Sequence, residues 1–133
     1  MTTIELIAYW LLFSAGCGAF EALLFHLANP VKTDLFNQKY GDIHGYFTIF
    51  RAVGFLPILF TGWGVVGLLF AVLTFPLIHD GMYYEVRHLL DERLYECGFW
   101  SNESKDTTAK ISLTLEERIF TFVGGFGLLL LTL

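Results

Sequence analysis

The sequence is that of one small, apolar domain. Its 133 residues are 55% hydrophobic and 17% aromatic, and only 16% are charged, which is too apolar for an ordinary soluble domain. The net charge of -5 argues against nucleic acid as a partner, because a nucleic-acid-binding domain needs a basic surface. Residues 1-133 are therefore predicted to form a single all-α integral membrane protein domain in the lipid bilayer.

The first apolar segment is predicted to cross the membrane as a helix over about residues 4-28. Only Glu5 and Glu21 are charged within it, and about 20 consecutive apolar residues are enough to span the hydrocarbon layer. Pro30 ends the segment, because a proline disfavours helical structure in the residue before it.

The second apolar run, residues 43-78, is too long for a single crossing. At about 1.5 Å per residue, a straight helix of this length would overshoot the bilayer, so the run must fold back on itself. Gly62 and Gly64 permit the tight turn that this requires. The run is therefore predicted to form two spans, at about residues 44-61 and 63-79.

The last part of the chain contains a surface helix and a fourth span. Apolar residues after the third span recur at helical spacing, which predicts a short cytoplasmic amphipathic helix or an extension of that span into water. The fourth span is predicted at about residues 115-133, where Thr114 and Glu117 form a capping box at its start. The result is a four-transmembrane-helix bundle with two long connections, at residues 29-43 and 80-114.

The basic residues predict how the bundle is oriented. Every lysine and arginine except Arg51 lies in or beside the two long connections: Lys32, Lys39, Arg87, Arg93, Lys105, Lys110 and Arg118. Basic residues favour the cytoplasmic side of a membrane. We therefore expect both connections to be cytoplasmic and both termini to lie on the non-cytoplasmic side.

Two charged residues inside the predicted spans form the first candidate site. Charges within a membrane normally face a protein interior or a water-filled cavity and find a partner there. Glu21 shares its helix face with small residues that allow close helix contact, and Arg51 continues a polar stripe on the second span. We predict that they form an intramembrane ion pair. Such a pair is either a fastener between helices or a site for a proton, an ion or a substrate headgroup.

Histidines and carboxylates near the cytoplasmic ends of the predicted spans form a second candidate site. Imidazole and carboxylate groups are ligands for zinc, iron and manganese, and two histidines can also hold haem. A Glu-x-x-His spacing places two such ligands on one helical face, as in di-iron carboxylate bundles. The candidate ligands of a transition metal or haem are His26, His44, His79, Asp80, Glu85 and His88. The simpler interpretation is that polar residues collect at a membrane interface.

Three classes of function fit these patterns. The first is a subunit or interaction partner in a membrane assembly, either a homo-oligomer or part of a larger complex, which docks through small-residue stripes and a polar cytoplasmic face. The second is a metal- or haem-binding membrane enzyme acting on a lipid or redox substrate, with Glu21 or Asp80 handling protons. The third is a homo-oligomeric channel or transporter that uses Glu21 and Arg51.

Overall fold

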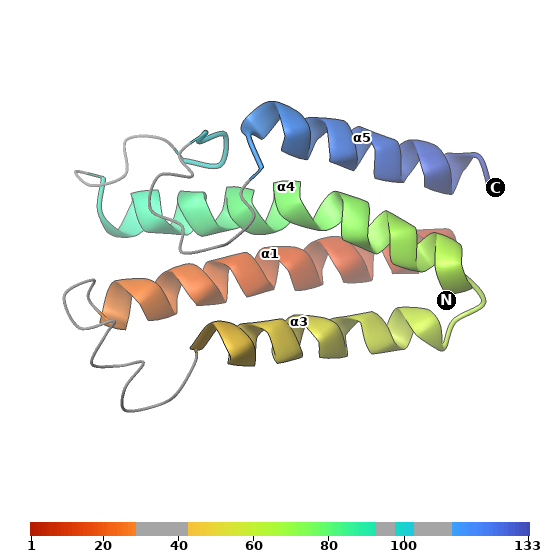
Figure 1. The fold of residues 1–133 in the computed structure, drawn as a ribbon, viewed down its shortest axis with the longest axis horizontal. Coiled ribbons are helices and arrows are strands. Elements are labelled where there is room, and N and C mark those ends of the chain that lie inside the picture. Colours follow the sequence, from red (N-terminus) through yellow and green to blue (C-terminus); the bar gives the residue numbers. More distant parts are fainter. Residues whose placement is uncertain (29–42, 93–97, 103–112) are drawn as a thin grey trace.

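The described part of the chain is entirely helical. The computed structural model describes residues 1–28, 43–92, 98–102 and 113–133, and within these ranges it contains four α-helices and no strand (Figure 1). The helices are α1 (Thr3–Ala28), α3 (Ile43–Leu59), α4 (Gly64–Leu90) and α5 (Leu115–Leu130). The prediction of an all-α chain is confirmed for these residues. Of the four helices, α1 and α4 are long and apolar enough to cross a membrane, and α3 is apolar but shorter.

Two helix starts follow from local sequence. Gly64 begins α4 with a φ of +46°, a backbone conformation that glycine adopts without a steric penalty. At the start of α5, the Thr114 side chain accepts a hydrogen bond from the Glu117 backbone N–H, and the Glu117 carboxylate accepts one from the Thr114 N–H. The predicted capping box is confirmed.

The predicted separate amphipathic helix after the third span is wrong. Residues that were assigned to it continue α4, which runs unbroken to Leu90. Pro76 lies inside this helix. The helix continues past it because a proline removes only one backbone hydrogen bond, and the neighbouring turns keep theirs. Gly81 is the only other helix-weakening residue in this half of α4, and the ring of Phe99 packs directly against it. The alternative, in which the same helix continues past the apolar segment, describes the structure.

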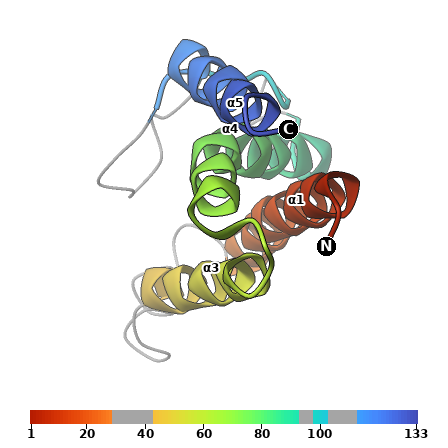
Figure 2. The same cartoon turned by 90° about the vertical axis from the view of Figure 1, so that its right-hand side faces the viewer.

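The helices form an open array. Two parallel helices, α1 and α4, pack together along their length, and α3 and α5 run antiparallel to them (Figure 1). Viewed end-on, α3 and α5 lie on opposite sides of the α1–α4 pair, with α5 packed on α4 (Figure 2). Both termini and the turn between α3 and α4 lie at one end of the molecule.

Two aromatic side chains of α1 tie it to the other helices. Trp10 is fully buried, and its indole Nε1 donates a 2.9 Å hydrogen bond to the carbonyl of Ala71 in α4. The Tyr9 hydroxyl donates a 2.9 Å hydrogen bond to the carbonyl of Gly54 in α3. These two hydrogen bonds connect α1 to α4 and to α3.

Gly18 allows a close approach between the backbones of α1 and α4. A Cβ atom at this position would lie 2.1 Å from the backbone carbonyl oxygen of His79. At Gly16, two residues earlier, a Cβ atom would meet nothing within 4 Å. The contact at Gly18 therefore determines how α1 and α4 align, and it brings Glu21, one turn further along α1, to the level of His79.

Alanine at these two glycines tests the contact. We expect Gly18→Ala to destabilise the protein by about 1–3 kcal/mol, because the added methyl group forces two backbones apart. Gly16→Ala should be neutral or slightly stabilising, since alanine is the better helix former. Thermal unfolding in detergent, followed by tryptophan fluorescence, compares the two variants. Equal melting temperatures would show that α1 and α4 do not meet at Gly18.

Candidate functional site

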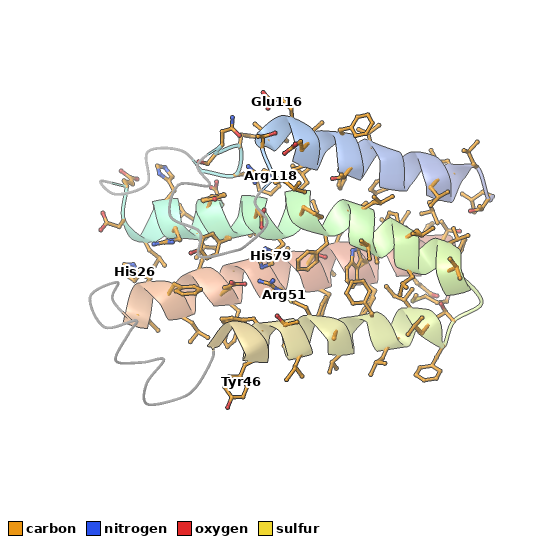
Figure 3. All side chains as sticks on the ribbon, viewed as in Figure 1. His26, Tyr46, Arg51, His79, Glu116 and Arg118 are labelled. Atoms are coloured by element: carbon orange, nitrogen blue, oxygen red, sulfur yellow. The ribbon has the colours of Figure 1, made fainter. Side chains whose placement is uncertain are left out.

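An ionic network joins three helices near the middle of the molecule, where Figure 3 shows Arg51 and His79. Arg51 of α3 donates a hydrogen bond from Nη2 to Oε2 of Glu21 in α1. The same Nη2 lies 3.0 Å from Nε2 of His79 in α4. His79 Nε2 is in turn 3.0 Å from Glu21 Oε2, and His79 Nδ1 is 2.8 Å from Asp80 Oδ1. These four residues are called the ionic network below.

The ionic network has a buried interior and two open edges. The side chains of His79 and Glu21 are only 7% and 9% exposed. By contrast, the side chain of Arg51 is 29% exposed and that of Asp80 is 38% exposed. The interior pair is therefore shielded, and Arg51 and Asp80 are the members of the network that are open to the surroundings.

An aromatic ring closes one side of the ionic network. Phe75, one turn before His79 on α4, stacks on the imidazole with 4.7 Å between ring centroids. The Arg51 guanidinium also lies over this ring, 5.5 Å from its centroid, in a cation–π contact. Because the ring keeps water away, the electrostatic interactions within the network are stronger than they would be at a wet surface.

A buried arginine, Arg118, holds α5 in place. Arg118 is 1% exposed, donates a hydrogen bond to the carbonyl of Ser101, and places its guanidinium 5.7 Å from the centroid of the Tyr84 ring in α4. Asn102 Oδ1 accepts a 2.8 Å hydrogen bond from the backbone N–H of Leu115 at the start of α5. Figure 3 shows Arg118 at about the same position along the molecule as His79.

The structure distributes the candidate metal ligands over separate places. His79 and Asp80 belong to the ionic network, whereas His26 is exposed in the last turn of α1, at one end of the molecule (Figure 3). Both ring nitrogens of His79 already face carboxylates, and the positive charge of Arg51 lies against Nε2. This arrangement leaves His79 without a free lone pair directed at a cation.

Two other candidate ligands, Glu85 and His88, do not join this group. Glu85 Oε2 accepts a 2.8 Å hydrogen bond from the backbone N–H of Phe99. His88 is half-buried in the last turn of α4, about 13 Å further along the helix than His79. The side chain of His44 lies outside the described residues. Within the part of the chain that the structure describes, no three histidine, cysteine or carboxylate side chains gather into a metal site.

Comparison of the chain with protein-family models, with curated proteins and with solved structures finds no significant match. The chemistry of the site is therefore argued from its own contacts. A buried glutamate, a shared arginine and a histidine between two carboxylates can hold helices together, and they can also move a proton.

Sequence reasoning missed the connection between its two candidate sites. It assigned His79 to a metal cluster at the membrane surface and kept it apart from Glu21 and Arg51. It also gave no role to Trp10. The signal that links the sites is Gly18, which lies one turn before Glu21 and permits backbone contact with α4.

A double-mutant cycle measures the coupling between Glu21 and Arg51. Removing one buried partner leaves the other charge uncompensated, so Glu21→Gln and Arg51→Met are each expected to destabilise the protein, by up to about 3–5 kcal/mol. The double variant should lose less than the sum of the two single losses, with a coupling of about 0.5–3 kcal/mol. Chemical unfolding in detergent provides these values, and Glu5→Gln, at an exposed position of α1, is the control. Additive losses would show that the two side chains do not interact.

Proposed function

We propose that this chain is a polytopic membrane protein that acts as a subunit of a larger membrane assembly. Large apolar side chains are exposed on every described helix, among them Leu12 of α1, Ile49 of α3, Val65 of α4 and Phe120 of α5. A soluble monomer rarely exposes so much contiguous apolar surface, whereas a bilayer or a partner helix accommodates it.

Four crossings are consistent with the antiparallel arrangement of α3 and α5. These helices contain 17 and 16 residues, or about 26 and 24 Å at 1.5 Å per residue, which a locally thinned bilayer accommodates. The end of the molecule that holds both termini and the turn between α3 and α4 has no lysine or arginine in its sequence. By the positive-inside rule, this end is on the non-cytoplasmic side.

The observation that supports a partner best is the open edge of the ionic network at Arg51. Its side chain is 29% exposed on an apolar helix that lies at the outside of the array (Figure 2). A guanidinium facing hydrocarbon is unfavourable, and such groups are normally covered by protein. On the side of α3 next to Arg51, the helix exposes Ala52 and Leu59, whereas Tyr46, Ile49, Val53 and Leu56 lie on the opposite side of the helix. A second membrane helix lying beside Arg51 would cover the charge together with Ala52 and Leu59.

The packing gives less support to a channel through a single copy of the chain. Between the ionic network and the end that holds the termini, the buried side chains of α1, α3 and α4 are mostly aromatic and aliphatic. Trp10 lies 4.6 Å from Phe55 and 5.9 Å from Phe75 between ring centroids, so rings fill this space. Any pore formed by this chain would have to run between copies.

Cysteine labelling tests the crossings and their direction. In a background of Cys17→Ser and Cys97→Ser, we introduce Thr132→Cys near the C-terminus or Glu92→Cys just after α4. An impermeant maleimide added to intact cells should label the first cysteine, and should label the second only after the membrane is permeabilised. Labelling of both cysteines in intact cells would contradict the proposed topology.

Site-directed photo-crosslinking tests the partner on α3. A photoreactive amino acid at exposed position 52, beside Arg51, should give a protein adduct of one discrete mass in native membranes, identified by mass spectrometry as a second copy or another chain. The same residue at exposed position 120 of α5 is the control. The adduct at position 52 should weaken in Arg51→Met if the partner contacts the guanidinium. Lipid adducts alone at position 52 would refute a partner on this surface.

A further inference from the structure

We propose that His79 carries protons between Asp80, at the open edge of the ionic network, and Glu21 in its interior. This inference goes beyond a role in assembly, and it depends only on contacts within one copy of the chain. The ligand of the site is a proton, supplied by water at the Asp80 edge.

The geometry is that of an imidazole bridging two carboxylates. Nδ1 is 2.8 Å from Asp80 Oδ1 and Nε2 is 3.0 Å from Glu21 Oε2, so both ring nitrogens are within hydrogen-bonding distance of an acid. Asp80 is 38% exposed, while Glu21 is 9% exposed. A proton that reaches Glu21 from outside therefore has a short route through Asp80 and His79.

The route is also continuous with the polar half of α4. Residues 64–78 of this helix carry no charge, and Asp80 is its first carboxylate. Beyond Asp80, ionisable side chains recur along the helix to its end, at Glu85, Arg87 and His88. Asp80 thus lies where the apolar half of the helix meets its polar half.

The transfer conserves protons and charge. At the start, neutral His79 donates its Nε2–H to the ionised Glu21, and the Nδ1 lone pair faces Asp80. Asp80 takes a proton from hydronium in the surrounding water, which leaves a water molecule, and passes it to Nδ1, so the Asp80 O–H bond breaks as the Nδ1–H bond forms. The Nε2–H bond then breaks as an O–H bond forms on Glu21. One proton has moved from Asp80 to Glu21, and His79 is again neutral, with its hydrogen on Nδ1.

Arg51 is placed to respond to this transfer. Its Nη2 contacts Glu21 Oε2 and also lies 3.0 Å from His79 Nε2. Nε2 cannot accept a hydrogen bond from Arg51 while it carries its own hydrogen. Before the transfer, Arg51 pairs with the ionised Glu21. After it, Glu21 is neutral and Nε2 is an acceptor, so the same guanidinium can bond to His79 with little movement.

Beyond Glu21 the route ends. Among the described residues, the other titratable groups next to the ionic network are Cys17 on α1 and Tyr83 on α4. Ser14, two turns before Glu21, is buried, and its hydroxyl has no hydrogen-bond partner. After it come the packed rings of α1 and α4, with Trp10 at their centre. The structure therefore favours reversible loading of a proton onto Glu21 over conduction through the helices.

Infrared difference spectroscopy after a rapid pH drop tests the relay in the full-length protein, reconstituted in phosphatidylcholine nanodiscs. The carbonyl band of protonated Glu21 is assigned by its loss in Glu21→Gln. Asp80→Asn keeps a polar side chain of similar size next to Nδ1, but its amide cannot deliver a proton to the imidazole. We expect it to slow the appearance of the Glu21 band by roughly tenfold or more. His79→Gln should slow it similarly, and His26→Gln, at an exposed histidine outside the network, should leave the rate unchanged.

Chemical rescue separates proton transfer from a structural effect. Formate, a small diffusible carboxylic acid, should restore the rate in Asp80→Asn and have little effect on the unaltered protein. A structural defect would not respond to formate. The proposal is overturned if Glu21 protonates equally fast in Asp80→Asn, if formate gives no rescue, or if no Glu21 band appears at any pH at which the protein remains folded. Because the readout uses isolated nanodiscs, it does not depend on any assembly partner.

Discussion

The backbone contact between α1 and α4 at Gly18 is the constraint on which the rest of the structure depends. Two parallel helices come close enough there that no side chain fits between Gly18 and the carbonyl of His79. One turn later, Glu21 meets the imidazole of the same residue. A shift of one residue along α1 would rotate Glu21 by about 100° and separate the two side chains. The position of a glycine thus determines the geometry of a charged site.

The ionic network also explains how α3 is held at the edge of the array. Two of its polar contacts reach α1, through the Gly54 carbonyl to Tyr9 and through Arg51 to Glu21. Buried ion pairs usually contribute more to specificity than to net stability, because desolvation offsets their attraction. Between apolar helices in lipid, where the hydrophobic effect does not discriminate one helix face from another, such contacts decide which face of α3 turns inward.

The sequence predicted the helices better than the site because their signals are local. Apolar length, the glycine turn before α4 and the capping box at Thr114 all act within a few residues. The continuity of α4 was uncertain because Pro76 and Gly81 both weaken a helix, and only tertiary packing shows that the helix persists. The pairing of His79 with Glu21 depends on the alignment of α1 and α4, which no local pattern contains. The polar residues inside the apolar segments therefore predicted that Glu21 and Arg51 meet, as they do, but not that His79 joins them.

The two open edges of the ionic network become linked if both proposals hold. The Arg51 guanidinium has two possible acceptors, Glu21 and His79, and which of them it bonds to depends on whether Glu21 carries a proton. A partner that covers Arg51 favours one of these two arrangements over the other. Thermodynamic linkage then requires the effects to be reciprocal: protonation of Glu21 changes the affinity of the partner by the same factor by which the partner changes the proton affinity of Glu21. The coupling needs no long-range movement, because one guanidinium takes part in both events. One edge of the network would contact a neighbouring helix and the other would contact water. The affinity of the chain for its partner would therefore depend on the local proton concentration.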